Sequence, residues 1–284
     1  MRVLIFISLL FFGTPLTVFS LELEVPEAVG QGEPFYIQVG SESKAQKLTV
    51  VWLDNDYEFP VDFPGSTSIL LGTGLKNQGP VSLQVKTEHQ GQLQRDKKTL
   101  LISKKDFPEQ RLTLPESMVD PPQETLDRII RERDMTVNAL NTFSARRLWE
   151  EDFTRPVPGS ISSRFGVRRF LNDQPRSPHR GVDLRGAQGT PVKAMNRGRV
   201  VLTGNFYFGG RTVIIDHGFG LLTLYMHLSK IMVSEEDQVE NGQILGLVGS
   251  TGRSTGPHLH LGMYILGQPV DPLMLAESNP VRPE

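Results

Sequence analysis

Short runs of β-forming residues, separated by turn signals, extend along nearly the whole chain and leave one stretch with helical periodicity. In residues 21–105 the runs LELEV, FYIQV, KLTVVWL, STSILL, PVSLQV and KKTLLIS are rich in Val, Ile, Leu and aromatic residues. Turn-forming stretches such as GQGEP, FPGS and NQGP separate them. Strands of this length and spacing predict a small β-sandwich of immunoglobulin-like size, with Trp52 in its core.

A second β-rich region begins near residue 154, where glycines become frequent and the apolar runs become shorter. These runs are GRVVLTG, TVIIDHG, LLTLYMHL, QILGLVG and HLHLGMYI. They predict a second all-β domain with many tight turns over residues 154–276, followed by a tail over 277–284. The chain of 284 residues is long enough for two ordinary domains.

Residues 106–153 are expected to form a linker and one helix. The linker, residues 106–122, is rich in proline and mixed in charge. Apolar side chains then recur at helical spacing, at Leu126, Ile129, Ile130, Val137, Leu140 and Phe143. Asp120 is predicted to cap this helix, with Pro121 in the first helical position, and the segment ARRLWEEDF is predicted to close it. We expect the helix to pack on the C-terminal domain.

Residues 1–20, MRVLIFISLLFFGTPLTVFS, are predicted to be an export signal. Arg2 supplies a positive start, and the apolar run Val3–Phe12 is too short to span a bilayer comfortably. Val18 and Ser20 are small enough for a cleavage site after Ser20. The alternative is an uncleaved N-terminal anchor. We expect an exported protein that has no membrane span once the signal is removed.

Two properties of the composition exclude whole classes of function. The formal net charge is only −2, so no strong field favours nucleic acid or an anionic membrane as a partner. The chain contains no cysteine, which excludes disulfides, a cysteine nucleophile and a thiolate zinc site. A metal centre would have to be built from His, Asp or Glu.

The segment TGRSTGPHLHLGMYI places His258 and His260 two residues apart at the start of a predicted strand. Side chains at positions i and i+2 of a strand point to the same face, about 6–7 Å apart. Both imidazoles therefore face one groove, although this distance does not make both of them metal ligands. One can bind a metal while its neighbour reaches a water molecule or the substrate.

A second candidate pair, His179 and Asp183, lies in SPHRGVD. Residues four apart share one face of a helix. Pro178 and Gly181 nevertheless favour a loop that leads into a strand, so helical geometry is not assured.

His227, in LYMHLS, is a third candidate, and Tyr225 is expected to share its face and either contact substrate or only pack. His217 follows Asp216 in IIDHGFG at a strand end and fits a structural role, in which its ring binds the turn backbone. The glycines near these candidates are expected to serve turn geometry: Gly209, Gly210, Gly252 and Gly256.

Histidines and a carboxylate in this number match the needs of a cysteine-free hydrolytic zinc site. Catalytic zinc takes three protein ligands and leaves a fourth position for water, which it activates near neutral pH. Further groups must move protons, and histidine suits this role because its ordinary pKa is about 6.5.

The segments SRFGVRR, HRGVDLRGAQGTPVKAMNRGRVV, TVIIDHGFGLLTLYMHL, ENGQILGLVGSTGRSTGPHLHLGMY and PVDPL occur in this order over residues 155–275. In sequence and in the order HxxxD, single His, HxH, this region closely resembles the lysostaphin-type (LytM) zinc metalloendopeptidases. The resemblance implies a compact antiparallel β-sheet domain with a groove closed by loops. It does not cover the front half of the chain.

The resemblance also implies a role for each candidate residue. His179, Asp183 and His260 match the three ligands of one Zn²⁺ ion. His227 and His258 match two catalytic histidines, of which one takes a proton from water and the other stabilises the oxyanion or protonates the leaving amine. Which histidine does which is left open. No position of the core motif is missing.

The substrate implied by the resemblance is a peptide of bacterial peptidoglycan, and a periplasmic enzyme that cuts a D-Ala–diaminopimelate cross-link is expected by analogy. Extracellular or wall-associated locations are the alternatives. Some relatives have lost ligands, so a non-catalytic wall-binding or hydrolase-activating module is a competing hypothesis. A zinc peptidase for other extracellular peptides is a third. The front domain could hold the enzyme at the wall, bind a partner or cover the groove.

Overall fold

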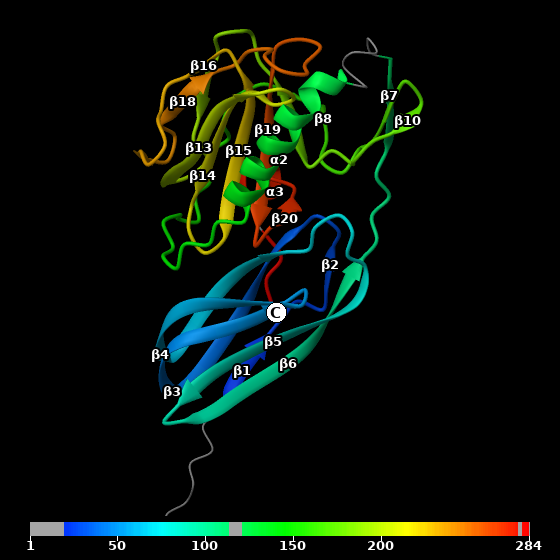
Figure 1. The fold of residues 1–284 in the computed structure, drawn as a ribbon. Helices are drawn as coiled ribbons and strands as arrows, with labels where there is room; N and C mark the ends of the chain where they lie inside the picture. The colour runs from blue at the N-terminus through cyan, green and yellow to red at the C-terminus, as the bar shows by residue number, and fades with distance from the viewer. Residues whose placement is uncertain (1–19, 114–120, 278–279, 284) are drawn as a thin grey trace, which may run out of the picture.

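The computed structural model describes residues 20–113, 121–277 and 280–283 of the chain. They form a front β domain and a C-terminal β domain that lie end to end, and a linker with one long helix that lies beside the C-terminal domain (Figure 1). The mostly β fold class is as predicted. Residues 1–19 of the predicted export signal lie outside the described residues. In the part of the chain that is described, no helix is long and apolar enough to cross a membrane.

Six strands form the front domain: β1 (Leu21–Glu24), β2 (Ala28–Gly30), β3 (Pro34–Trp52), β4 (Asn55–Gly72), β5 (Gly79–His89) and β6 (Gln92–Ser103). They are hydrogen-bonded into one sheet in the order β1-β3-β5-β6-β2, with β4 on the other side of β3. The predicted runs FYIQV and KLTVVWL belong to the single strand β3, which continues through register shifts between Ser41 and Lys47.

This sheet curls over its own core. The Leu23 N–H of β1 donates to the Asp96 carboxylate of β6 at 2.9 Å, although two strands separate β1 from β6 in the sheet order. Trp52 is buried as predicted, and its indole N–H donates to the Gly72 carbonyl at 2.9 Å. The core is therefore enclosed by one bent sheet rather than by two separately bonded sheets.

The linker contributes strand β7 (Glu109–Leu112), the 3-10 turn η1 (Gln123–Thr125) and helix α2 (Leu126–Leu140). Asp120 lies outside the described residues, and the prediction that Pro121 is the first helical residue is wrong. The predicted helix is also too long, because ARRLWEEDF is not helical. At the end of α2 the Val137 carbonyl accepts from the Asn141 backbone N–H at 3.1 Å and from the Asn141 side-chain amide at 2.9 Å.

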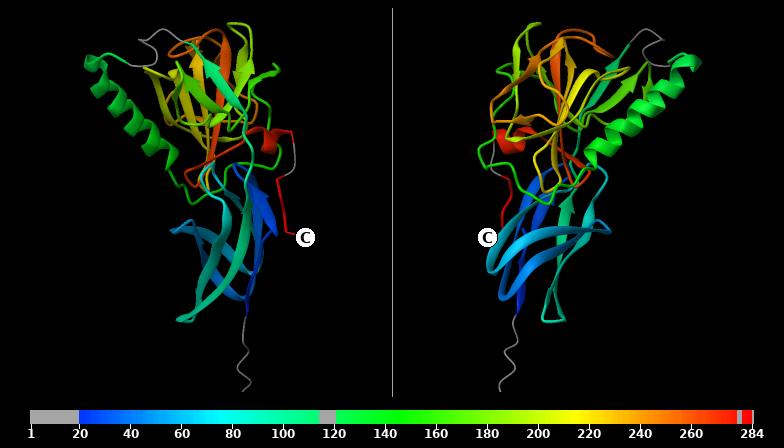
Figure 2. Two further views of the ribbon diagram at one scale, coloured as in Figure 1. Left: turned by 90° about the vertical axis from the view of Figure 1, so that its right-hand side faces the viewer. Right: turned by 60° about the vertical axis from the view of Figure 1, so that its left-hand side comes forward.

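Helix α2 packs on the C-terminal domain as predicted (Figure 2), but mainly through its last turn. Ala139 and Leu140 are buried in a cluster with side chains of that domain: Leu202, Phe206, Ile214, Leu222, Leu224 and Tyr264. The Tyr207 N–H donates to the Glu132 carboxylate at 2.6 Å and adds a polar contact to the interface. The apolar stripe of the helix is only partly buried, since Ile130 and Val137 are each 47% exposed.

Aromatic side chains hold the front domain against the C-terminal domain. Phe143, just after α2, lies 5.4 Å from Phe59 and 6.2 Å from Tyr57 between ring centroids. Phe219 of the C-terminal domain packs on Phe59 at 5.2 Å, and the Tyr57 hydroxyl donates to the Leu266 carbonyl. The two domains therefore share packed contacts in addition to the covalent linker.

The C-terminal domain contains strands β8 (Ile161–Ser163), β9 (Arg168–Leu171), β10 (Gln174–Pro175), β11 (Gly181–Arg185), β12 (Pro191–Lys193), β13 (Gly198–Phe206), β14 (Gly210–Asp216), β15 (Leu221–Leu228), β16 (Lys230–Ile231), β17 (Gln238–Val239), β18 (Ile244–Leu247), β19 (His258–Ile265) and β20 (Gln268–Val270), and helix α3 (Leu273–Ala276). The main sheet has the antiparallel order β17-β13-β14-β15-β19-β11-β8, with β20 on β19. Two three-stranded sheets, β12-β18-β16 and β10-β9-β7, flank it, and β7 brings the linker into the second of these.

Candidate functional site

The pairing of β11 with β19 places the candidate residues of two distant motifs side by side. Asp183 lies opposite His260, and Arg185 lies opposite His258. Because alternate residues of a strand share a face, Asp183, His258 and His260 all project to the same side of the sheet. His227 arrives at the end of β15, which pairs with the other edge of β19.

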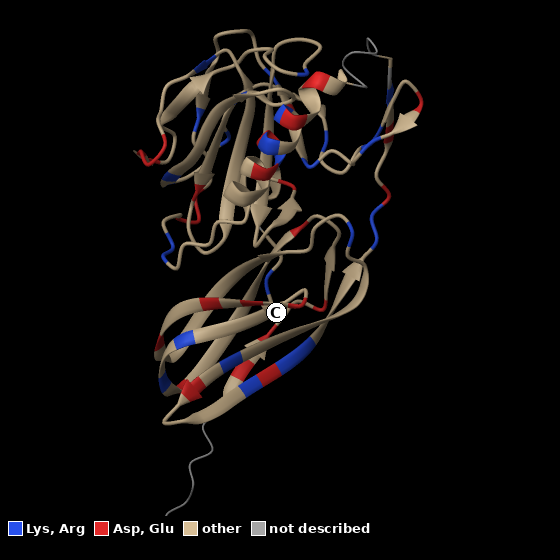
Figure 3. Cartoon of the chain, in the orientation of Figure 1, with Lys and Arg blue, Asp and Glu red and all other residues tan. Residues whose placement is uncertain are grey.

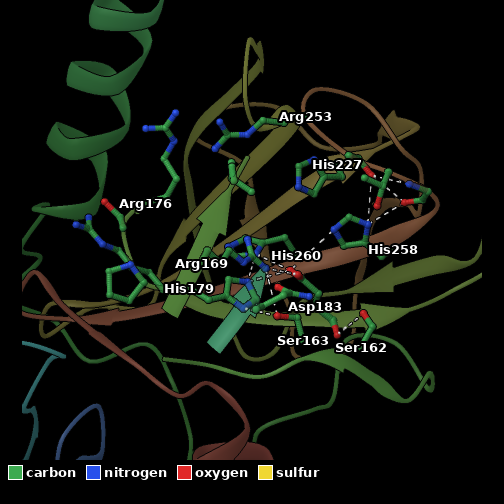
Figure 4. A pocket seen from close by; sticks show the side chains of 18 of the residues that line it. Ser162, Ser163, Arg169, Arg176, His179, Asp183, His227, Arg253, His258 and His260 are labelled. Carbon is green, nitrogen blue, oxygen red and sulfur yellow. Dashed lines mark hydrogen bonds and ion pairs between the residues drawn. The ribbon is translucent and has the colours of Figure 1, made fainter. Parts of the chain in front are cut away.

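His179, Asp183 and His260 direct one polar atom each toward a common point (Figure 4). The Asp183 Oδ1 atom lies 2.8 Å from His260 Nδ1 and 3.0 Å from His179 Nε2. The two imidazole nitrogens are themselves 3.0 Å apart. His258 is further away, with its Nε2 atom 3.9 Å from Asp183 Oδ1. Three atoms of this kind, drawn from a loop and two strands, can hold one divalent cation.

Neighbouring groups fix the orientation of this cluster. The His179 Nδ1–H donates to the Arg164 carbonyl at 2.9 Å, which leaves Nε2 facing Asp183. The second carboxylate oxygen of Asp183 accepts from Arg169 at 2.7 Å. Gly181 is required beside it, because a Cβ atom there would lie 2.2 Å from the Leu261 carbonyl oxygen. Supporting contacts of this type orient metal ligands and tune their basicity.

His227 and His258 face the same cavity with their rings 4.7 Å apart. The His227 Nδ1–H donates to the Thr251 carbonyl at 2.8 Å, and the His258 Nδ1–H donates to the Gly256 carbonyl at 2.8 Å. Each backbone contact selects one tautomer and leaves Nε2 as the atom that can exchange a proton in the cavity.

The electrostatics of the cluster favour the forms that bind a cation. Burial lowers the pKa of His179 to about 4, and burial together with the charges of His260 and His258 lowers the pKa of His227 to about 3. Burial alone would raise the pKa of Asp183, but hydrogen bonds from His179 and His260 hold it well below its usual range. At neutral pH His179 and His227 are therefore neutral and Asp183 is ionised.

The expected shared face of Tyr225 and His227 does not form. His227 has a left-handed backbone with φ of +64°, which interrupts the strand alternation at the end of β15. Tyr225 is fully buried, and its hydroxyl accepts from the Met195 N–H at 2.9 Å. Tyr225 therefore packs in the core. Of its two predicted roles, packing is confirmed and substrate contact is wrong.

His217 lies in the core, away from the cavity. Its Nδ1–H donates to the Arg197 carbonyl at 2.6 Å, and its Nε2 atom lies 2.7 Å from the Thr223 hydroxyl. The ring is completely buried. The predicted structural role, in which the ring binds backbone, matches the contact with Arg197, and the contact with the Thr223 side chain is an addition to it.

The burial of His217 predicts an acid-sensitive contribution to stability. Burial lowers its pKa from 6.5 to about 4, so the unfolded chain binds a proton more readily than the native protein does. The contribution is complete above pH 6.5 and is lost as the pH falls toward 4, at up to about 1.4 kcal/mol per pH unit. Urea unfolding of wild type and His217→Gln at pH 7 and pH 5 measures this. Wild type should lose more free energy of unfolding between the two pH values, whereas equal losses would contradict the assignment.

The cavity has a volume of about 810 Å³ and lies over the five candidate residues. The loop before β19 and the segment around β9 and β10 form parts of its wall, and the linker adds Gln110 of β7 and Arg133 of α2. Neither of these two linker residues was predicted from the sequence to line the site. No local pattern could have located them, because their position depends on how β7 pairs with β9 and on how α2 packs.

Gly252 is needed for the loop that holds His227. Its φ is +72°, and a Cβ atom there would lie 2.3 Å from the Gly210 backbone nitrogen. Gly242→Ala is a matched control, because Gly242 has φ of +76° and open space around its Cβ position. We expect Gly252→Ala to lower the free energy of unfolding by about 1–3 kcal/mol more than the control, through overpacking. Denaturant unfolding of both variants measures the difference, and equal losses would show that the loop can move aside.

The profile of peptidase family M23 matches residues 177–272, which lie in the C-terminal domain. The peptidoglycan DD-endopeptidase ShyA of Vibrio cholerae is 46% identical over 112 residues, which are 39% of this chain and 26% of that protein. The DD-carboxypeptidase/endopeptidase Mpg of Neisseria meningitidis is 44% identical over 120 residues, 42% of this chain and 28% of that protein. The matches thus span about a quarter of the length of these relatives.

Similarity in three dimensions extends beyond this domain. A crystal structure from Pseudomonas aeruginosa described as an M23 peptidase superimposes with a TM-score of 0.64 at 27% identity. The alignment covers 83% of this chain and 90% of that one, so it includes part of the front half. The resemblance to the lysostaphin-type peptidases is confirmed for the C-terminal domain.

Proposed function

We propose that this protein is an exported zinc metalloendopeptidase that hydrolyses peptide cross-links of bacterial peptidoglycan. The observation that carries the proposal is the convergence of His179, Asp183 and His260 beside two oriented histidines in an open cavity. The names of the Vibrio and Neisseria relatives support peptidoglycan as the substrate. The alternative, a non-catalytic wall-binding or hydrolase-activating module, is less favoured because all five residues are present and face one cavity.

The donor set fits zinc. Two imidazole nitrogens and one carboxylate oxygen are ordinary ligands of catalytic zinc, and three protein ligands leave a position open. His179 Nε2, Asp183 Oδ1 and His260 Nδ1 would hold the ion, with Arg169 fixing the carboxylate. When bound, zinc supplies a Lewis acid that polarises the peptide carbonyl and activates a water molecule.

His227 and His258 would move the protons of the reaction. Their Nδ1–H groups are committed to backbone carbonyls, so proton exchange takes place at Nε2 in each ring. One ring accepts the proton of the attacking water, and the other donates to the developing oxyanion or to the leaving amine. The backbone contacts hold both rings in position before the substrate arrives.

The bond that is cut can be identified by mass. Zinc-loaded protein is incubated with purified cross-linked muropeptide dimers and, separately, with uncross-linked pentapeptide monomers. An endopeptidase converts the dimers to monomers, whereas a carboxypeptidase, the second activity in the name of the Neisseria relative, removes one terminal residue from the monomers. Dimers that persist at one bound zinc per chain would refute the proposed function.

For export, the N-terminal sequence of periplasmic protein is expected to begin at Leu21.

A further inference from the structure

The linker strand β7 carries one uncharged residue, Gln110, into the wall of the cavity. Strand β7 runs parallel to β9, and their register places three residues of each strand opposite one another: Glu109 with Arg168, Gln110 with Arg169, and Arg111 with Phe170. Successive side chains of a strand point to opposite faces, so the middle pair occupies a different face from the two outer pairs. The middle pair, Gln110 and Arg169, lines the cavity.

On the other face, the paired side chains satisfy one another. The Glu109 carboxylate lies 3.3 Å from the Arg168 guanidinium, and the Arg111 guanidinium lies over the Phe170 ring at 4.3 Å. Arg111 also pairs with Asp173 at 3.2 Å. Figure 3 shows charges of both signs along β7 and the neighbouring hairpin of β9 and β10. The charges of this face therefore have partners within the linker and the hairpin.

On the cavity face, two polar atoms of one register pair have no hydrogen-bond partner within the described part of the protein: Oε1 of Gln110 and Nε of Arg169. The Nη2 atom of Arg169 is in use, since it donates to the Asp183 carboxylate at 2.7 Å and to the Ser163 hydroxyl at 3.3 Å. Both unpartnered atoms are shielded from solvent. Leaving a buried polar group unpaired costs free energy, which a ligand that supplies the partner recovers. One acceptor and one donor are therefore available to a molecule that enters the cavity.

An extended peptide offers the two complementary groups. The N–H and C=O of one residue in an extended chain point to the same side, as they do in a hydrogen-bonded pair of an antiparallel sheet. The N–H can donate to Gln110 Oε1, and the C=O can accept from Arg169 Nε. Neighbouring strands lie about 4.8 Å apart, so side chains from opposite positions of β7 and β9 can reach the same residue of a ligand.

Arg169 places this pair next to the reacting centre. Its guanidinium lies beside the His179–Asp183–His260 cluster (Figure 4), where it holds the Asp183 carboxylate. Gln110 and Arg169 are only half-buried as whole residues. The terminal torsion of a glutamine side chain has broad minima, so Oε1 can turn toward a bound peptide. A peptide whose scissile carbonyl reaches the cluster therefore passes within reach of both side chains.

We propose that Gln110 and Arg169 bind the backbone amide groups of one substrate residue, its N–H at Gln110 and its C=O at Arg169. The inference rests on the proposed function and adds a substrate-binding residue to it. Gln110 lies outside residues 177–272, the region that the family profile matches. The linker strand is thus part of the substrate site.

The test uses Gln110→Met, which keeps nearly the size of the side chain and removes its polar atoms. The substrates are a cross-linked muropeptide dimer and the same peptide dimer without its sugars. We expect KM to rise about 3- to 10-fold for both substrates, with kcat within twofold of wild type and zinc content unchanged, because one neutral hydrogen bond is lost. Glu109→Met is the matched control, because it makes the same change at the neighbouring position on the other face of β7. It should leave KM unchanged.

Three outcomes would overturn the inference while the proposed function stands. A wild-type KM in Gln110→Met would show that the substrate does not use this acceptor. A rise in KM for the dimer with sugars alone would assign the site to the acetamido groups of the glycan. A loss of kcat together with zinc would show that Gln110 only positions Arg169 and Asp183.

If wild type cleaves neither dimer, the proposed function fails, and equilibrium binding of the sugar-free dimer, measured by calorimetry, decides the inference. A dissociation constant about 3- to 10-fold higher for Gln110→Met than for wild type and Glu109→Met would support it. Equal dissociation constants, or no binding by wild type, would refute it.

Discussion

Replacing His258 with alanine is expected to lower kcat for cross-link cleavage by about 100- to 10,000-fold, the usual contribution of a positioned acid or base. The ring lies 4.7 Å from that of His227, and its Nε2 atom is 3.9 Å from Asp183 Oδ1. It is thus beside the metal cluster but further from Asp183 than the atoms of His179 and His260. The variant should lose proton transfer and keep its metal.

The measurement combines a muropeptide digest with metal analysis of the same protein sample. Wild type and His258→Ala should each bind one zinc per chain, while only wild type should convert dimers to monomers at an appreciable rate. His89→Ala is a control, because His89 ends β5 in the front domain. If His258→Ala cleaved at the wild-type rate, the ring would be structural. If neither protein cleaved the dimers while both bound peptidoglycan, the result would support the hypothesis of a non-catalytic module.

Asp183→Asn should abolish both zinc binding and cleavage. Asp183 Oδ1 lies within 3.0 Å of both His179 Nε2 and His260 Nδ1, so its negative charge is central to the cluster. Losing a group that only supports a metal ligand costs 10- to 100-fold in affinity, so the loss of a ligand charge should cost more than about 100-fold.

Unfolding temperature gives a readout that does not depend on activity. Zinc at 1,000 times its dissociation constant stabilises a native protein by about 4 kcal/mol, so it should raise the unfolding temperature of wild type. Asp183→Asn should show little change at the same zinc concentration. Asp56→Asn, which alters an exposed carboxylate of the front domain paired with Lys86, should respond like wild type. A zinc-dependent shift in Asp183→Asn equal to that of wild type would remove Asp183 from the ligand set.

The positions of strands were predictable from the sequence because Val, Ile and aromatic runs between turn signals carry local information. The way in which these runs join into longer strands was less predictable from the sequence. The stretch GSESKAQ contains no apolar run, yet it stays extended in β3 by pairing with β4, and this depends on residues far away in the chain. The end of α2 at Leu140 was missed for a similar reason, since the residues that follow are used in the contact between domains.

The candidate residues of the site were predictable because their spacing expresses strand geometry. His258 and His260 share a face, as two residues in one strand must, and the His179–Asp183 pair does lie where a loop enters a strand. Tyr225 was not predictable in this way, since the rule of alternation fails at the positive φ of His227.

The central claim is that this protein is a peptidase of the bacterial wall and that its activity requires one bound zinc. Removing the metal and restoring it tests this claim most directly. Wild-type protein is stripped with a chelator, divided, and incubated with cross-linked muropeptide dimers with or without one equivalent of zinc. The account predicts that dimers persist in the stripped sample and become monomers in the restored one. Equal cleavage in both samples, or intact dimers in the restored sample with zinc bound, would contradict it.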